Sequence, residues 1–287
     1  MAETAASTET SARAAGAGPT IAVAFGCGGA RGLAHIHIIE ALDELGIRPV
    51  LIAGASIGAI LGAAMAAGMS GAEIRDYTLA TVGNRVAVLN KLWSLRPVTM
   101  RGFRLGQFNL ERILRAFLPA GFPETFAELE IPLKVIATDY YGQAEVMTAR
   151  GDLIQALAAS AAIPAVFMPV RVGERIMIDG GIINPIPYEH LAGLADIVIA
   201  VDAVGAPDGD GIDIPTRIES VFGSGQLMMQ ANIALKLKLQ VPDVFLRPSV
   251  ARIGILDFLK ARDILAMSAG VKDELKFALD AAIRARS

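Results

Sequence analysis

The sequence carries no charged residue between Arg48 and Glu73, and the stretch 51–69 reads LIAGASIGAILGAAMAAGM. A segment of this length could cross a bilayer, which needs roughly 20 apolar residues. However, Gly54 and Ser56 indicate a turn between a strand and a helix, which leaves only about 12 helical residues, too few to span. The stretch therefore predicts a short helix that is apolar all round because it is buried, and a fold with a thick core.

The composition indicates a thick core or a lipid-facing surface and argues against several functional classes. Hydrophobic residues make up 53% of the 287 residues and charged residues 19%, with a mean hydropathy of +0.49. The net charge of −3 gives no support for nucleic-acid binding. A single cysteine, Cys27, excludes an internal disulfide, and with three histidines it leaves too few ligands for a structural zinc site. We therefore expect neither a metal nor a cofactor.

Apolar strands alternate with helical segments along the chain. Strands are expected at 21–25, 50–53, 134–138, 175–178 and 196–201, and helices at 32–45, 56–67, 109–118, 217–239 and 257–285. Fully apolar strands alternating with helices imply a mainly parallel sheet that is covered on both faces. The predicted fold class is therefore α/β, a three-layer α/β/α sandwich with a mainly parallel central sheet.

The chain contains no internal repeat and is expected to form one domain over residues 19–287. Cuts in the loops near 84–106 or 205–213 would leave fragments without a full sheet. Residues 1–18 are rich in alanine, serine, threonine and glycine without a periodic apolar face, which predicts a disordered N-terminal tail. The tail lacks the apolar region of a signal peptide, which favours a cytoplasmic location.

Ser56 has Gly54 and Gly58 two positions to either side, which is the G-x-S-x-G spacing of serine hydrolases. A tight strand-to-helix turn projects such a serine, and the glycines prevent side-chain clashes. The turn also places Ser56 at a helix N-terminus, where the helix dipole favours developing negative charge. On this pattern alone, a serine that only caps the helix is an equal alternative.

A glycine-rich loop, GCGGARG at residues 26–32, follows the first expected strand. Successive backbone N–H groups in such a loop can bind an anion, either a phosphate or a transient oxyanion. The loop lacks the last glycine of a dinucleotide fingerprint, and the lysine of a P-loop is absent. The oxyanion interpretation is therefore favoured.

Asp179 ends another expected strand and is followed by Gly180 and Gly181, within MIDGGIINPIP at 177–187. A carboxylate at the C-terminal end of a parallel strand lies on the edge where functional sites gather. The alternative is an Asx-turn, which is common for Asp-Gly.

A Ser-His-Asp triad would also need a histidine. His190 follows Asp179 in the Ser…Asp…His order of α/β-hydrolases, whereas His35 and His37 lie on the helix after the glycine loop. We expect all three histidines to make local hydrogen bonds instead.

Taken together, GCGGARG, GASIG and DGG resemble the patatin-like phospholipase family, most closely its small bacterial stand-alone members. The resemblance runs from about residue 20 to 275 and includes GLAHIHIIEAL, IPLKVIATD, ASAAIPAVFMP and DGGIINPIP. It implies a single patatin-like domain in which Ser56 is the nucleophile and Asp179 the base of a Ser-Asp dyad.

The resemblance also assigns roles within the glycine loop. The family pattern G-G-G-x-R/K-G falls on residues 27–32, so the backbone N–H groups of Gly28 and Gly29 would form the oxyanion hole, with Cys27 where the family has its first glycine. Arg31 would neutralise charge near the loop or bind a substrate phosphate, or else point outward into solvent. Supporting roles in the loop and the turns are expected for Gly26, Arg31, Gly32, Gly54, Gly58, Gly180 and Gly181.

The implied activity is that of a serine lipid acyl hydrolase, of the phospholipase A, lysophospholipase or carboxylesterase type. Asp179 would accept the proton of Ser56 during attack on an ester, and an acyl-enzyme would then be hydrolysed. A carboxyl group with an ordinary pKa of about 3.9 is a weak base, so we expect Asp179 to be desolvated, with a raised pKa. The alternatives are a non-catalytic lipid- or nucleotide-binding protein and an α/β-hydrolase with a Ser-Asp-His triad that uses His190.

Two segments could contact lipid or a partner. Residues 85–104 carry five basic residues, no acidic residue and the only tryptophan, Trp93, which suits peripheral contact with an anionic membrane such as the inner membrane surface. Alternatively, this segment is a lid over the site or a loop over the core. Within 222–239, Met228 and Met229 could line an acyl pocket or an oligomer contact, or pack in the core. The sequence predicts no oligomeric state.

Overall fold

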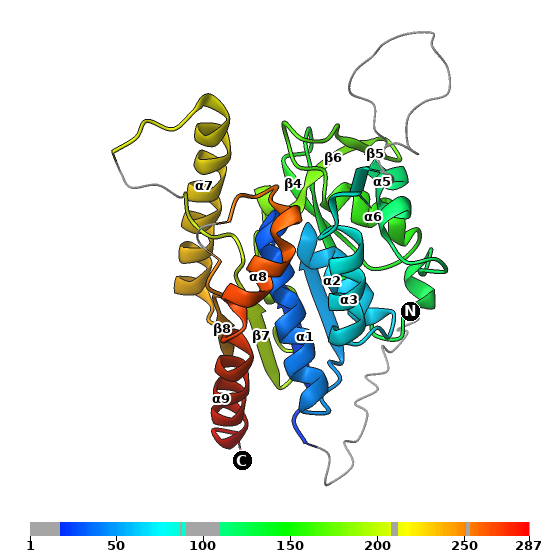
Figure 1. Cartoon of the computed structure of the whole chain (residues 1–287). Helices are drawn as coiled ribbons and strands as arrows, with labels where there is room; N and C mark the ends of the chain where they lie inside the picture. Colours follow the sequence, from blue (N-terminus) through cyan, green and yellow to red (C-terminus); the bar gives the residue numbers. More distant parts are fainter. Residues whose placement is uncertain (1–17, 87, 90–109, 208–211, 251–252, 287) are drawn as a thin grey trace, which may run out of the picture.

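The computed structural model describes residues 18–86, 88–89, 110–207, 212–250 and 253–286 (Figure 1). Residues 1–17 of the predicted tail lie outside this part. Within it, one eight-stranded mixed sheet has the order β5-β6-β3-β2-β1-β7-β8, with β4 paired to β3. The strands are β1 (Ile21–Phe25), β2 (Leu51–Ala55), β3 (Leu133–Asp139), β4 (Ala144–Thr148), β5 (Val170–Val172), β6 (Arg175–Asp179), β7 (Ile197–Val201) and β8 (Val244–Leu246).

The centre of the sheet is parallel, as predicted. Strands β3, β2, β1, β7 and β8 run in one direction, whereas β6 and β4 pair antiparallel to β3, and β5 pairs antiparallel to β6. The carboxyl ends of β1, β2 and β7 therefore meet at one edge, where open parallel sheets bind ligands.

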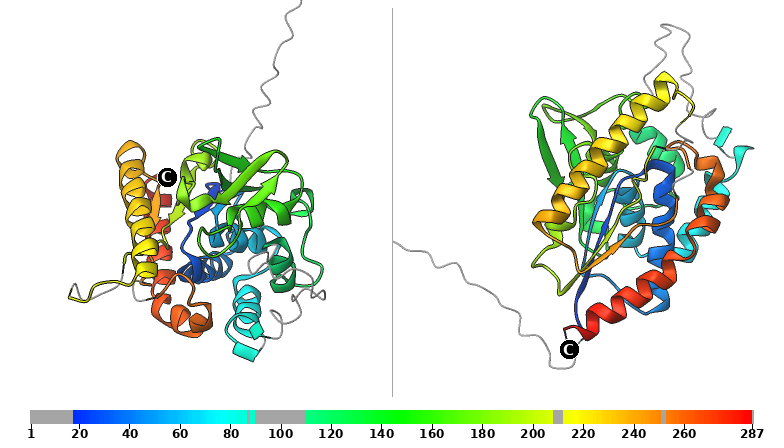
Figure 2. Two further views of the ribbon diagram at one scale, coloured as in Figure 1. Left: turned by 90° about the horizontal axis from the view of Figure 1, so that it is seen from above. Right: turned by 90° about the vertical axis from the view of Figure 1, so that its left-hand side faces the viewer.

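Helices cover both faces of the sheet, which confirms the three-layer α/β sandwich. The helices are α1 (His35–Glu44), α2 (Ile57–Ala66), α3 (Gly71–Thr81), α5 (Leu110–Phe117), α6 (Leu153–Ser160), α7 (Arg217–Leu239), α8 (Ala261–Ser268) and α9 (Val271–Arg284). The right-hand view of Figure 2 shows strands between α7 on one side and α8 and α9 on the other. The larger core cluster joins the sheet to each of these helices except α7, and a smaller cluster joins the opposite face to α7 and the 3-10 turn η4 (Tyr188–Leu191).

The side chains of strand β1 contribute alternately to the two core clusters on the opposite faces of the sheet. Val23 and Phe25 belong to the larger cluster, while Ala22 and Ala24 belong to the smaller one, because successive side chains of a strand point to opposite faces. All four are fully buried, so the strand is apolar throughout, as expected for a parallel strand covered on both sides.

Helix α2 is the buried helix that the uncharged stretch predicts, and Gly62 lies at its contact with the sheet. A Cβ at Gly62 would lie 3.1 Å from Ile52 Cγ2 and 3.4 Å from the Phe25 ring. We predict that Gly62→Leu lowers the free energy of unfolding by about 1–3 kcal/mol through overpacking, measured by thermal denaturation. Gly225→Leu is the matched control, since Gly225 lies in α7 and a Cβ added there would have no atom within 4 Å. Equal melting temperatures for Gly62→Leu and the wild type would contradict tight packing here.

The structure differs from the sequence predictions in several elements. The expected helix at 257–285 is wrong as one unit, because it is interrupted at Ala269 and Gly270 between α8 and α9. The helix expected from residue 32 begins instead as a 3-10 helix, η1 (Gly29–Ala34), which α1 continues. Strands β4, β5 and β8 and helices α3 and α6 were not predicted. Helix α3 carries a signal that could have revealed it, the capping box of Ser70 and Glu73.

None of the helices in the described residues combines the length and the apolar character that a membrane span requires.

Candidate active site

Ser56 occupies the tight turn between β2 and α2. Its φ of +56° is a backbone conformation that residues other than glycine rarely adopt. The backbone N–H donates to Ser160 Oγ at 2.8 Å, and the carbonyl accepts from the Ala59 N–H at 3.0 Å. Although Ser56 is the N-cap residue of α2, its side chain makes no capping hydrogen bond. The hydroxyl is therefore free for another partner, which disfavours the simple capping role.

The two glycines of the G-x-S-x-G motif allow close backbone approach. A Cβ at Gly54 would lie 2.6 Å from the Ala59 backbone, and one at Gly58 would lie 2.2 Å from the Phe25 carbonyl oxygen. Backbone atoms cannot yield as a flexible side chain can. The glycines thus let α2 begin directly against β1 and β2, as the motif predicts.

The register of β3 brings Asp179 to Ser56. Ile136 of β3 pairs with Ala55, the residue before the serine, and the next residue, Ala137, pairs with Asp179 on β6. Asp179 therefore does not end a parallel strand, and this part of the sequence prediction is wrong, because β6 is antiparallel to β3. The two side chains reach each other from strands on opposite sides of β3.

Ser56 Oγ donates a hydrogen bond of 2.5 Å to Asp179 Oδ2. The other carboxylate oxygen, Oδ1, accepts from the Gly181 N–H at 2.8 Å, so the Asx-turn is present as well. Burial raises the pKa of Asp179 to about 6, although the hydrogen bonds from Ser56 and Gly181 favour the ionised form. The expectation of a desolvated carboxyl with a raised pKa is confirmed. At neutral pH the group is ionised and can accept a proton.

Residues Thr138 and Ser160 support this pair, and the sequence reasoning missed both. The Thr138 hydroxyl donates to the Asp179 carbonyl at 2.8 Å, and the Ser160 hydroxyl donates to the Ile136 carbonyl at 2.5 Å while it accepts from Ser56 N–H. Nothing in the sequence distinguishes these two hydroxyls from other buried ones.

The glycine loop, residues 26–32, presents two unused backbone donors. The N–H groups of Cys27 and Ala30 donate to the carbonyls of Pro185 and Ile255, at 2.9 and 2.8 Å. Between them, the N–H groups of Gly28 and Gly29 have no acceptor among the described residues. The loop therefore holds a pair of free donors between two fixed peptides.

Glycine is required at four positions of this loop because of close contacts. A Cβ would lie within 2.6 Å of another atom at each of Gly26, Gly28, Gly29 and Gly32. Gly29 also has a φ of +58°, which favours glycine. Close contacts also favour glycine at the two positions after Asp179. A Cβ added at Gly180 would lie 2.1 Å from the Ile136 carbonyl oxygen, and a Cβ added at Gly181 would lie 2.5 Å from Cys27 Sγ.

Arg31 is buried, so the alternative of an outward, solvated side chain is wrong, while a role in charge neutralisation or phosphate binding stays a prediction. Its Nε donates to the Ile253 carbonyl at 2.5 Å and its guanidinium also donates to the Val204 carbonyl. Both acceptors are backbone oxygens of segments beyond the loop. The guanidinium thus ties the glycine loop to the chain after β7 and after β8.

Cys27 is buried, and its Sγ lies 3.5 Å from Met229 Sδ of α7. Burial raises the pKa of the thiol well above its usual value, so it stays protonated. The side chain fills space beside Gly181, and the Cys27 backbone N–H keeps its hydrogen bond to Pro185.

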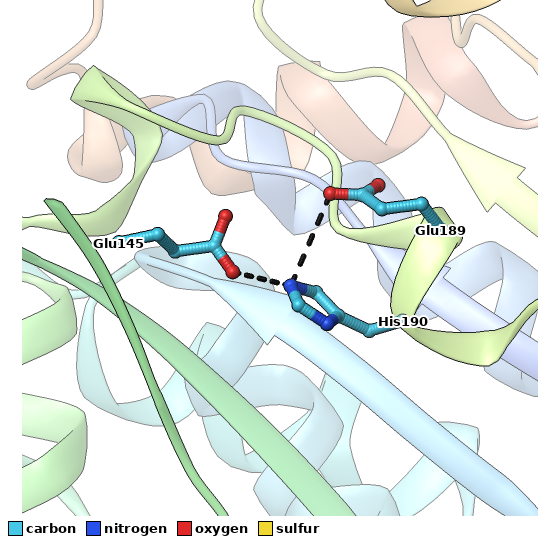
Figure 3. Close-up of side chains that lie close together, drawn as sticks. All are labelled: Glu145, Glu189 and His190. Carbon is cyan, nitrogen blue, oxygen red and sulfur yellow. Dashed lines mark hydrogen bonds and ion pairs between the residues drawn. The ribbon is translucent and has the colours of Figure 1, made fainter. Parts of the chain in front are cut away.

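The histidines bond to groups other than Ser56 and Asp179, as expected. His190 pairs with Glu145 and Glu189, as Figure 3 shows, and the hydrogen bond to Glu145 raises its pKa. His37 bonds to Glu40 and to the Leu265 carbonyl, and His35 to the Gly26 carbonyl. The geometry does not assemble the alternative triad with His190.

The Glu145, Glu189 and His190 cluster carries metal-type ligand atoms within 4.8 Å of one another. The Lys236 ammonium lies 2.5 Å from Glu189 Oε2, and Asn184 donates to both carboxylates. The negative charge is thus already compensated by groups of the chain, and the cluster gives no support for a metal site.

A cavity of about 460 Å³ opens beside Ser56 and Gly29. Its lining contains no charged side chain among the described residues and is almost entirely apolar. Residues that line it come from α2, α3, α5, the segment after α6 and the segment before α8, and include Ile57, Ile60, Leu114, Phe167 and Phe258.

The methionines of α7 take no part in this cavity. Met228 is 67% exposed, and Met229 is partly buried and packs beside Cys27 against the smaller core cluster. The prediction that they line an acyl pocket is therefore wrong, while the oligomer contact stays a prediction. Most of the basic segment 85–104, including Trp93, lies outside the described residues, and its membrane contact also stays a prediction.

Comparisons with known proteins extend these observations. A model of the family described as patatin-like phospholipase matches residues 23–192. An uncharacterized NTE family protein of Mycobacterium tuberculosis is 37% identical over 201 residues, which cover 70% of this chain and 53% of that protein. The human patatin-like phospholipase domain-containing protein 6 is 32% identical over 232 residues, which cover 79% of this chain and 16% of the human protein. The chain thus spans about half the length of the mycobacterial relative and a much smaller share of the human one.

Solved structures show more distant likeness. ExoU of Pseudomonas aeruginosa, in complex with SpcU, gives a TM-score of 0.43 at 15% identity, covering 92% of this chain and 53% of that chain. VipD from Legionella pneumophila gives a TM-score of 0.41 at 16% identity, covering 77% of this chain and 55% of that chain.

Proposed function

Because the chain belongs to the patatin-like phospholipase family, we propose that it is a serine acyl hydrolase that cleaves lipid esters with Ser56 as nucleophile and Asp179 as base. The observation that carries this proposal is the 2.5 Å hydrogen bond from Ser56 Oγ to Asp179 Oδ2 beside an apolar cavity. A nucleophile in contact with a base, with free donors nearby, is the arrangement that acyl transfer needs.

The reaction follows from these groups. Asp179 takes the hydroxyl proton as Ser56 Oγ attacks the ester carbonyl, and the N–H groups of Gly28 and Gly29 stabilise the oxyanion. The carbonyl re-forms, the proton passes from Asp179 to the leaving alcohol, and an acyl-enzyme remains. Water then gives a proton to Asp179 and attacks the acyl carbon. When the bond from the acyl carbon to Ser56 Oγ breaks, Asp179 returns this proton to Ser56 Oγ, which releases the fatty acid and restores both residues.

The cavity supports a fatty-acyl substrate. The described residues of the lining carry no charged side chain, so they would solvate a hydrocarbon chain and would penalise a phosphate or another charged head group. The acyl chain therefore enters the cavity, and the alcohol part of the lipid stays outside. This division fits phospholipids, lysophospholipids and simple carboxylic esters alike.

The test of the proposal is labelling by an alkyl fluorophosphonate, followed by identification of the modified peptide. We expect one label on Ser56, blocked by long-chain fatty acid, together with hydrolysis of esters in a panel of phospholipids, lysolipids and neutral glycerides. His190→Ala should leave both readouts unchanged. Lipid binding without labelling or hydrolysis would instead identify a non-catalytic lipid-binding protein.

Ala64 is expected to limit the length of the acyl chain. Ile57, Ile60, Leu61 and Ala64 line the cavity from one face of α2, and at 1.5 Å per residue Ala64 lies roughly 12 Å along the helix from Ser56. We predict that Ala64→Phe lowers kcat/KM for long-chain p-nitrophenyl esters about tenfold or more and leaves acetate and butyrate esters unaffected.

The matched control for this substitution is Ala231→Phe, on the exposed side of α7, which should leave the chain-length profile unchanged. An equal loss for short and long esters in Ala64→Phe would contradict the proposed path of the acyl chain.

A further inference from the structure

A fully buried histidine, His35, lies directly behind the glycine loop. It is the first residue of α1, and its Nε2 lies 2.8 Å from the Gly26 carbonyl oxygen. The other ring nitrogen, Nδ1, has no partner among the described residues. The ring packs beside Phe25, with the ring centroids 5.2 Å apart.

The contact with Gly26 fixes the protonation of the ring. A carbonyl oxygen only accepts, so Nε2 carries the proton and Nδ1 the lone pair. Burial lowers the pKa of His35 to about 4, so the ring is neutral at physiological pH. Its single N–H is thus committed to Gly26.

The peptide between Gly26 and Cys27 is held on both sides. Its carbonyl accepts from His35, and its N–H donates to the Pro185 carbonyl at 2.9 Å. The Gly26 carbonyl also lies close to the start of α2, since a Cβ added at Gly58 would lie 2.5 Å from the Gly26 carbonyl oxygen. This peptide is therefore the fixed point from which the next two residues extend.

Those next residues are Gly28 and Gly29, whose N–H groups have no acceptor among the described residues. Glycine restricts the backbone angles φ and ψ less than any other residue, so the peptides of two consecutive glycines are the least restrained by their own side chains. The direction of their N–H groups depends on the fixed peptides at either end, one of which His35 holds.

We propose that His35 is a positioning residue for the oxyanion hole: its Nε2–H orients the Gly26–Cys27 peptide and thereby aims the N–H groups of Gly28 and Gly29 at the developing oxyanion. The inference rests on the proposed function, since it gives the loop its task. It differs from a purely structural role because it predicts a loss specific to the transition state.

The experiment compares His35→Leu, which removes the donor, with His35→Gln, whose amide can donate to Gly26. His37→Leu is the matched control, because His37 lies in the same helix, is also buried, and bonds to Glu40 and Leu265 instead of the loop. We expect His35→Leu to lower kcat for ester hydrolysis by about 10- to 100-fold with KM within twofold of the wild type, and His35→Gln to recover most of the rate.

A second readout isolates the oxyanion. An alkyl trifluoromethyl ketone forms a tetrahedral anion with the serine, so its affinity should fall in His35→Leu by the same factor as kcat, while the affinity of the fatty acid product stays constant. If His35→Leu does not fold, His35→Asn, which is one methylene too short, should show the same pattern against His35→Gln.

Wild-type kcat in folded His35→Leu, an equal loss in His37→Leu, or an unchanged affinity for the ketone would each overturn the inference while the proposed function stands. A wild-type protein that neither hydrolyses esters nor takes the fluorophosphonate label would overturn both.

Discussion

Ser56→Ala is expected to lower kcat/KM for ester hydrolysis roughly 10⁴-fold or more while the fold is retained. The substitution removes only Oγ, which donates to Asp179 and makes no capping bond that stabilises α2. Loss of the nucleophile leaves the oxyanion donors and the cavity in place, so ester binding should persist. The measurements are steady-state hydrolysis of a chromogenic acyl ester and, for the same sample, near-ultraviolet circular dichroism.

Ser70→Ala is the control, because it makes the same chemical change at a half-buried serine outside the candidate site. Ser70 caps α3 through the Glu73 N–H, so its loss should cost about 1 kcal/mol of stability without changing the rate per folded molecule. Activity of Ser56→Ala within tenfold of the wild type would show that another group is the nucleophile.

The parts of the fold that could be predicted are those with a long, unambiguous apolar pattern. The strands β1 and β7 were predicted at 21–25 and 196–201, and their observed residues, Ile21–Phe25 and Ile197–Val201, are apolar throughout because both faces of the sheet are covered. The helix predicted at 217–239 matches α7 at both ends. The short strands β5 and β8 have three residues each, too few to establish a period. The helical spacing of apolar residues also continues through Ala269 and Gly270, so this spacing does not reveal the break between α8 and α9.

The candidate site shows the same division between local and non-local information. The local pattern singled out Ser56 and the glycines around it, with a capping serine as an equal alternative, because the turn and the close contacts belong to a few neighbouring residues. The position of Asp179 depends on the register of β6 against β3. In this register Asp179 pairs with Ala137, which lies about 40 residues earlier in the sequence, so no local pattern reveals it. Arg31 looked equally suited to solvent because its acceptors, at Val204 and Ile253, are backbone carbonyls that no side-chain pattern reveals.

Asp179→Asn is expected to lower kcat/KM roughly 10³-fold or more, because an amide keeps the shape of the carboxylate but cannot accept the serine proton. Asp139→Asn is the matched control, since Asp139 is also buried and ends the neighbouring strand β3, where it accepts from the Gly142 N–H at 2.9 Å. The double variant Ser56→Ala with Asp179→Asn should be no slower than either single one, because the two groups act as a unit.

The pH dependence ties this loss to Asp179 itself. With a pKa of about 6, the base is protonated in acid, so wild-type kcat/KM should rise about tenfold per pH unit up to pH 6 and then level off.

The folded-state pKa lies above the usual value of 3.8, so the folded protein favours the protonated carboxyl, and stability should decline as pH rises through 6. The amide in Asp179→Asn cannot ionise, so the variant should melt above the wild type at pH 8, and this advantage should shrink toward pH 4. A variant that loses activity but melts below the wild type at pH 8 would indicate a collapsed site rather than a missing base, because removal of a buried charge should stabilise an intact one.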